Sequence, residues 1–244
     1  MFQQFAVAAP WVVFLFAAVV FPVLFFIPAP YGRHARPGWG PTMPAKAAWV
    51  VMESVSFFVF AALWVLNPAF GTPVVTLLGV AWLIHYGQRS FVFSLLMRDE
   101  NRQKPLLTVV MAIIFNSLNA VGNATALSDR AIDLQLGLGL ALFAFGMGVN
   151  LHSDHVLRTL RKPGETGYLI PRGGFFTWVS APNYFGEILE WVGFAIAAQT
   201  LAGWAFVAFT VANLAPRALS NHRWYLRQFS DYPASRRALI PFVW

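Results

Sequence analysis

Seven long apolar runs follow one another along the 244-residue chain, and the short segments between them carry most of the charge. Each run is close to the roughly 20 residues that an α-helix needs to cross a bilayer. The connections at 67–72 and 199–200 are very short, so spans two and three, and spans six and seven, should be antiparallel neighbours. The pattern predicts an all-α, polytopic membrane protein with seven transmembrane helices, at residues 10–29, 47–66, 73–96, 106–125, 132–149, 175–198 and 201–219.

Composition supports this fold class. Hydrophobic residues make up 58% of the chain and charged residues only 11%, whereas about 25% of residues are charged in soluble domains. We expect one integral unit, in which residues 1–105 hold the first three spans and residues 106–244 hold the other four with a polar loop and tail. The chain has no cysteine, which excludes disulfides and thiolate metal sites. The first 32 residues contain no Lys or Arg, so the first run is predicted to be a permanent span rather than a cleaved signal peptide.

The distribution of basic residues predicts the topology. The segments after spans one, three and five, together with the C-terminal tail, carry 15 of the 17 Lys and Arg residues; the other two are Arg89 and Arg130. By the positive-inside rule the N-terminus is outside and the C-terminus is cytoplasmic. The same distribution accounts for the net charge of +7 without nucleic-acid binding, which we do not expect.

Five ionisable residues fall within or at the ends of the predicted spans. Each acid inside a membrane costs roughly 2.5–3.5 kcal/mol on insertion scales, which makes it a functional candidate. Glu53 has no basic neighbour on its own span, so it must find a partner on another helix or stay protonated. Arg89 suits a phosphate or carboxylate, or else snorkels to the interface. Asp133 should mark a helix start near the interface. The five are Glu53, Arg89, Asp133, Glu187 and Glu190.

The segment from 146 to 191 combines membrane-like sequence with the densest polar chemistry. Asn150, Asp154 and Arg161 recur at near-helical spacing, so they can line one side of an extended cytoplasmic helix that ends at Pro163 and Gly164. Asn183, Glu187 and Glu190 share one face of the following span and need polar partners. The nearby basic residues suit a polyphosphate, although lipid headgroups are an alternative. They are Arg158, Arg161, Lys162 and Arg172. Together these residue types indicate a nucleotide-like ligand.

Familiar nucleotide and metal motifs are absent. No Walker A sequence occurs, and Gly137 with Gly139 lies within a span and lacks the third glycine of a dinucleotide fingerprint. His152 and His155 are three residues apart but have no third ligand at a clear spacing, so no metal site is expected.

Three stretches resemble the membrane steroid 5α-reductase family. They are GMGVNLHSDHVLRTLRKPGETGYLIPRGGFFTWVSAPNYFGEILEW, the tail HRWYLRQFSDYPASRRALIPFVW, and HYGQRSFVFSLLMR in span three. The similarity covers most of the chain from Trp49 onward. It implies a seven-helix membrane enzyme, 3-oxo-5α-steroid 4-dehydrogenase in type, that uses NADPH to reduce a carbon–carbon double bond conjugated to a carbonyl.

The resemblance also implies roles for particular residues. The family's catalytic Glu corresponds to Glu53 and its catalytic Tyr to Tyr86, and Trp49 would form a wall of the substrate pocket. Many steroid-reducing relatives have Gln before the catalytic Glu, whereas this chain has Met52, which leaves the substrate carbonyl with one donor fewer. The cofactor-binding positions would be Arg89, Arg98, Asn150, Asp154, Arg161, Tyr168, Arg172, Asn183, Glu187, Arg217, His222 and Tyr225.

The implied reaction is the reduction of the C4–C5 bond of a 3-keto-Δ4 steroid. Hydride goes to C5, and Tyr86 and Glu53 stabilise the enolate at the carbonyl oxygen. The lipophilic enone would enter from the bilayer lipid, and NADPH would bind on the cytoplasmic side of a monomeric enzyme in a bacterial inner membrane.

Three alternatives stay open at this stage. The first is a reductase of the same chemistry that acts on an enoyl lipid or a polyprenal-like substrate. The second is a membrane methyltransferase of the isoprenylcysteine type, which would bind S-adenosylmethionine. The third is a seven-helix transporter or receptor, although we find no symmetry between halves of the kind that transporters show.

Overall fold

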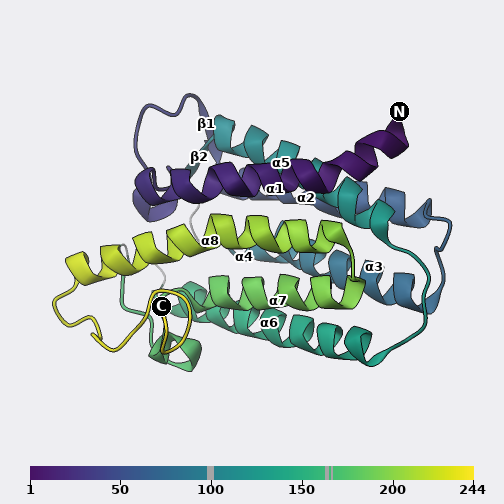
Figure 1. Ribbon diagram of the computed structural model, residues 1–244. Coiled ribbons are helices and arrows are strands. Elements are labelled where there is room, and N and C mark those ends of the chain that lie inside the picture. The colour runs from purple at the N-terminus through teal and green to yellow at the C-terminus, as the bar shows by residue number, and fades with distance from the viewer. Residues whose placement is uncertain (98–101, 163–164, 166) are drawn as a thin grey trace.

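The computed structural model describes residues 1–97, 102–162, 165 and 167–244, and within them the chain is mostly helical (Figure 1). A continuous rod forms where α3 runs through the π-helical segment η2 (Gln88–Phe93) into α4 (Ser94–Leu96). Short 3₁₀ turns η1 (Gly32–His34) and η3 (Gly174–Thr177) lie outside the long helices. These long helices are α1 (Phe2–Phe26), α2 (Ala45–Val65), α3 (Pro73–Gly87), α5 (Leu106–Ala126), α6 (Leu134–Thr159), α7 (Pro182–Ala198) and α8 (Leu201–Gln228).

Four helices in the described residues are long and apolar enough to cross a membrane, namely α1, α2, α5 and α6. The all-helical prediction is therefore confirmed, and the chain is an integral membrane protein. Figure 1 shows α3, α7 and α8 running in the same bundle as these four. That all seven cross the bilayer, with the N-terminus outside, stays a prediction.

The predicted start of the sixth span is wrong. The sixth span was expected from residue 175, but α7 begins at Pro182, and Gly174–Thr177 forms only a 3₁₀ turn. The reason is a contact with a distant part of the chain. Ser180 N donates to the carbonyl oxygen of Arg237 at 2.9 Å, and Arg237 N donates to that of Trp178 at 2.8 Å, so this backbone pairs with the C-terminal segment. The helix expected to extend beyond the fifth span is confirmed as far as Thr159, so Asn150 and Asp154 lie on one helix, α6, while Arg161 lies beyond its end.

The ends of α6 and α8 are fixed by side-chain caps. Asp133 is the N-cap of α6, where Oδ1 accepts from Leu136 N at 2.7 Å and Oδ2 accepts from Arg130 Nη1 at 2.8 Å. Such caps satisfy backbone donors that the helix leaves free. The expected helix-start role of Asp133 is confirmed. Thr200 caps α8 in the same way, accepting from Gly203 N at 3.1 Å, and so completes the two-residue turn from α7.

Glycines allow α6 and α7 to pack at very short range. A Cβ on Gly146 would lie 2.3 Å from Glu190 N, and one on Gly186 would lie 2.6 Å from Asn150 N. Gly139 and Gly193 make the equivalent contacts one heptad away. Small residues commonly let membrane helices approach in this way. The close approach sets the polar residues of α6 directly opposite those of α7.

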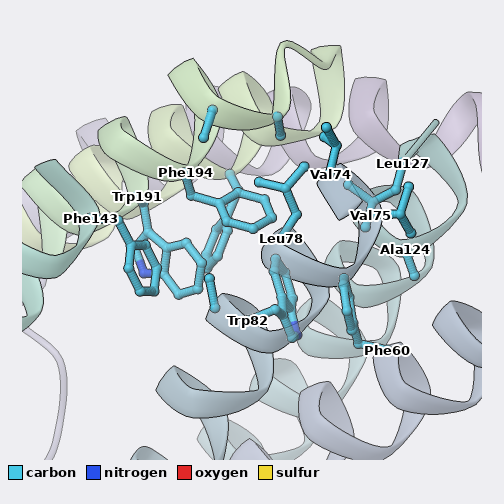
Figure 2. Close-up of a cluster of buried hydrophobic side chains, with 14 of the residues drawn as sticks. Phe60, Val74, Val75, Leu78, Trp82, Ala124, Leu127, Phe143, Trp191 and Phe194 are labelled. Atoms are coloured by element: carbon cyan, nitrogen blue, oxygen red, sulfur yellow. The ribbon is translucent and has the colours of Figure 1, made fainter. Parts of the chain in front are cut away.

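An aromatic cluster anchors α3 among its neighbours (Figure 2). Trp82 is fully buried and stacks on Phe60 of α2, with ring centroids 4.6 Å apart. On its other side it contacts Trp191 at 5.3 Å and Phe194 at 5.5 Å, both on α7. One turn later the chain reaches His85 and Tyr86, so this cluster fixes the position of both side chains.

A two-stranded antiparallel ladder joins the segments that precede α2 and α5. Strand β1 (Thr42–Pro44) pairs with β2 (Gln103–Pro105), and Met43 lies opposite Lys104. Because side chains alternate along a strand, Gln103 is exposed while Lys104 points inward and is buried.

Candidate active site

Arg89 is held at the meeting point of three helices. It lies in η2, and its Nη1 donates to Oδ2 of Asp154 on α6 at 3.1 Å, while Nη2 lies 3.7 Å from Oε2 of Glu187 on α7. Its guanidinium carbon is also 4.8 Å from the ring of Trp49. π-Helical segments often occur at functional sites. The side chain is 11% exposed, and its guanidinium lies between acids of α6 and α7.

Two asparagines extend this network between α6 and α7. Asn183 Nδ2 donates to Oδ1 of Asp154 at 3.0 Å. Asn150 Nδ2 donates to the carbonyl oxygen of Asn183 at 2.9 Å and to Oε2 of Glu187 at 3.4 Å. The polar face of α7 therefore has the partners that the sequence required. These bonds hold Asp154, Asn183 and Glu187 in fixed positions.

Glu190, the remaining acid of that face, has a different partner. Its Oε1 lies 2.7 Å from Nδ1 of His85 on α3, and both residues are buried, at 1% and 5% exposure. The ring of Trp191 covers the imidazole, with centroids 4.5 Å apart. Buried charged groups need such pairing. The pair joins α3 to α7 directly beside Tyr86.

Glu53 and Tyr86 come from neighbouring helices to one place. Tyr86 is buried and packs against Trp82 and His85, each with ring centroids 5.0 Å away. Its hydroxyl lies near Ser56 and Asn119. Among the acids, Glu53 has the strongest electrostatic effect on this hydroxyl. Arg89 and then Lys104 are the cations with the strongest electrostatic effect on Glu53. The carboxyl group and the phenol thus share one polar environment within an apolar bundle.

A cavity of about 1010 Å³ runs from these residues along the inside of the bundle. This is the upper end of the range of about 300–1,000 Å³ that ligand sites occupy. It also has apolar walls from α1 and α5. The predicted site residues that line it are Trp49, Glu53, Tyr86, Arg89, Asp154, Arg161, Tyr168, Asn183, Glu187, Arg217 and Tyr225.

Arginines and aromatic rings alternate around the rest of this cavity. The guanidinium of Arg33 lies 5.2, 5.0 and 4.6 Å from the ring centroids of Tyr168, Trp224 and Tyr225. That of Arg217 lies 5.1 Å from the ring of Tyr31. Burial raises the pKa of Tyr31, so its hydroxyl stays protonated. Nη1 of Arg33 is buried without a hydrogen-bond partner among the described residues. A cationic wall of this kind suits an anionic ligand.

Sequence comparison places this arrangement among known enzymes. Residues 102–244 match the family model described as 3-oxo-5-alpha-steroid 4-dehydrogenase. The chain is 43% identical over 222 residues to 3-oxo-5-alpha-steroid 4-dehydrogenase 1 of Macaca fascicularis, covering 87% of this chain and 84% of the relative. It is 43% identical over 228 residues to the human enzyme 2, covering 88% of each. The chain belongs to the 3-oxo-5-alpha-steroid 4-dehydrogenase family. A plant relative, steroid 5-alpha-reductase DET2 of Gossypium hirsutum, is 40% identical over 235 residues, with 91% and 90% covered.

Membership in the 3-oxo-5-alpha-steroid 4-dehydrogenase family makes the chain an oxidoreductase that acts on CH–CH bonds. The predicted resemblance to the steroid 5α-reductases is thereby confirmed. The roles of the individual site residues stay predictions, because the comparisons do not assign them.

Three of the described residues that were expected at the site do not line the cavity. Asn150 lies behind Asn183 and Glu187. The side chain of Arg172 is 69% exposed and lies 3.8 Å from Asp231. His222 Nδ1 lies 2.6 Å from Ser180 Oγ, in a cluster that fastens the C-terminal segment to α8. Arg98 lies outside the described residues.

Sequence reasoning also missed three cavity residues of this family member. The sequence indicated no role for His85, and Arg33 and Lys104 entered only the count of basic residues that predicts the topology, yet all three line the cavity. A signal existed for His85, because a lone histidine and a lone acid in separate apolar spans can satisfy each other. No local signal separates a buried loop cation from an exposed one.

Proposed function

We propose that this protein reduces the C4–C5 double bond of 3-keto-Δ4 steroids with NADPH. The observation that carries the proposal is a single cavity that connects Glu53 and Tyr86 with an arginine-rich region. The names of its relatives point to the same substrate class. An enone needs a hydrogen-bond donor at its carbonyl oxygen, and a reduced dinucleotide needs cations and polar groups for its phosphates and riboses.

The residues present fit such a cofactor. Its phosphates would be held by Arg161 and Arg217, and the orphaned Nη1 of Arg33 offers a further donor. The rings of Tyr168 and Tyr225 offer stacking surfaces. Asp154, Asn183 and Glu187 are already ordered by Arg89 and Asn150, so they would meet polar ligand groups without further loss of conformational freedom. When bound, NADPH supplies the hydride.

Tyr86 and Glu53 would act on the carbonyl group of the substrate. As hydride reaches C5, the electron pair of the C4–C5 bond moves toward the carbonyl and negative charge develops on its oxygen. Tyr86 donates a hydrogen bond to that oxygen, and Glu53 donates to it or orders Tyr86, which stabilises the charge where it forms. C4 then takes a proton, and the carbonyl is restored. The apolar walls exclude bulk water from the site and strengthen these interactions.

The proposed enzyme sits in the bilayer as a seven-span monomer. With the C-terminus cytoplasmic, the arginine-rich part of the cavity faces the compartment that holds NADPH, which in a bacterium is the cytoplasm behind the inner membrane. The apolar walls from α1 and α5 favour entry of a flat lipophilic substrate from the lipid. Those walls, together with Met52 in place of a polar residue, also suit an enoyl lipid, which is the second candidate substrate class.

The test is NADPH oxidation by detergent-purified protein against a panel of 3-keto-Δ4 steroids and enoyl lipids. Glu53→Gln should bind NADPH as wild type does but turn over at least 100-fold more slowly, in the range that general acid and oxyanion groups contribute. Asp129→Asn, an exposed acid outside the cavity, is the matched control. Wild-type turnover in Glu53→Gln would contradict its catalytic role. Fluorescence changes on adding S-adenosylmethionine but not NADPH would instead favour the methyltransferase.

A further inference from the structure

Lys104 is a buried lysine that the mechanism above does not use. It is 4% exposed and sits in β2, where pairing with Met43 turns its side chain inward. The side chain lines the same cavity as Glu53 and Tyr86. Lysine is almost never fully buried unless it is paired. The question is therefore what pairs with it.

No oxygen acceptor for Lys104 exists in the described part of the chain. Its Nζ lies 3.2 Å from Sδ of Met52, 4.2 Å from the ring of Trp49 and 4.6 Å from that of Tyr31. An ammonium has three N–H donors, and a thioether is only a weak acceptor. The two aromatic faces supply cation–π contacts but accept no full hydrogen bond. At least one strong donor is left free beside Met52, Trp49 and the cavity.

The surroundings of Lys104 make binding of an oxygen acceptor favourable. Burial lowers the pKa of the Lys104 ammonium to about 7, although Glu53 opposes this shift. Arg217 and Arg89 add to the lowering, and no carboxylate lies within salt-bridge distance of Nζ in the described residues. An incoming oxygen that carries negative charge would relieve this cost, because hydrogen bonds to charged groups are the stronger ones.

The position of Lys104 in the cavity indicates which ligand oxygen would accept its hydrogen bond. Its contacts with Met52 and Trp49 are with residues of α2 just before Glu53, and its contact with Tyr31 is with a ring that Arg217 also approaches. We propose that Lys104 donates a hydrogen bond to the carbonyl oxygen of the enone substrate, and so determines specificity for a ketone.

This proposal rests on the proposed function. No bond to Lys104 forms or breaks in the reaction, because it only donates to the oxygen on which negative charge develops. The negative charge on the carbonyl oxygen increases from substrate to enolate, so the hydrogen bond from Lys104 becomes stronger. Lys104 should therefore affect both ketone binding and turnover.

The experiment compares ligands and variants together. Affinities of wild type and Lys104→Met are measured in detergent, with NADP⁺ bound, for a 3-keto steroid and for the same skeleton without the ketone. Wild type should prefer the ketone, and Lys104→Met should lower that preference about 10- to 100-fold, as expected for one charge-assisted hydrogen bond. Adding Met52→Gln to Lys104→Met should restore part of the preference. Lys46→Met, a partly exposed lysine outside the cavity, is the control.

The outcomes separate the two proposals. If wild type neither binds nor reduces 3-keto steroids, the proposed function itself fails. If wild type reduces them but Lys104→Met keeps the ketone preference, or loses affinity equally for both ligands, only the role of Lys104 is overturned. A loss confined to NADPH affinity would likewise overturn it in favour of a cofactor contact. Lys104→Leu gives the same comparison should the methionine variant fail to fold.

Discussion

Replacing Gly146 by Ala tests whether the close contact between α6 and α7 builds the site. The new Cβ would lie 2.3 Å from Glu190 N and 2.6 Å from the carbonyl oxygen of Gly186. Both atoms belong to the backbone of α7, so no side-chain rotation relieves the clash. To reach an ordinary contact of 3.4 Å, the helices must separate locally by about 1 Å.

Two costs follow from that separation. Overpacking typically destabilises a protein by about 1–3 kcal/mol, and we expect the upper part of that range because rigid backbone opposes the new methyl group. The hydrogen bonds from Asn183 to Asp154, at 3.0 Å, and from Asn150 to Asn183, at 2.9 Å, would also stretch beyond bonding distance. NADPH affinity should therefore fall together with stability, by roughly 10-fold for the loss of one or two hydrogen bonds.

Thermal unfolding in detergent and NADPH fluorescence titration measure the two effects. Gly148→Ala is the matched control, because it lies on the same helix and its Cβ would meet no atom within 4 Å. In the control, alanine should stabilise α6 by up to about 1 kcal/mol through helix propensity alone. If Gly146→Ala behaves like Gly148→Ala in both assays, the proposed role of this helix contact in shaping the site is wrong.

The remaining predictions concern single polar groups. Asp133→Ala should lower stability by about 0.5–2 kcal/mol through loss of the α6 cap, with turnover per folded molecule unchanged. Arg89→Lys, which cannot reach Asp154 and Glu187 together, should weaken NADPH binding by roughly 10-fold or more, and unchanged titration curves would contradict that. Because the folded-state pKa of Lys104 is lowered from 10.5 to about 7, the folded protein holds fewer protons than the unfolded chain between those values. Stability should thus rise with pH across that window, by at most ~5 kcal/mol, and Lys104→Met should flatten the rise in denaturation midpoints.

The fold could be predicted from sequence where local pattern decides it. Apolar runs predicted every long helix, and the two-residue connection at 199–200 correctly made α7 and α8 antiparallel neighbours. The segment 175–181 was misassigned because Phe175, Phe176 and Trp178 continue the apolar pattern. Its backbone instead pairs with Arg237, some 60 residues later. Hydropathy carries no information about such a partner.

The sequence predicted which types of residue form the site, but not which side chains pair with each other. The spacing of Glu187 and Glu190 correctly indicated a shared helix face in need of polar partners. It did not indicate that Glu187 would lie near Arg89 while Glu190 would pair with His85. The division depends on the registry of α3 against α7, which the aromatic packing around Trp82 sets. Registry arises from three-dimensional packing, and no single span encodes it.

Lys104 counts as a loop cation in the predicted topology, yet its side chain is buried in the cavity. Counting charges places Lys104 in a loop with other basic residues, where it supports the predicted orientation. The count assumes that loop charges face water or headgroups, and the β1–β2 ladder breaks that assumption by turning Lys104 inward while leaving Gln103 outside. Removing Lys104 from the count leaves the charge asymmetry intact, so the topology does not depend on it. A cation that the topology does not require, and that finds no oxygen acceptor among the described residues, is better explained by a ligand than by the membrane.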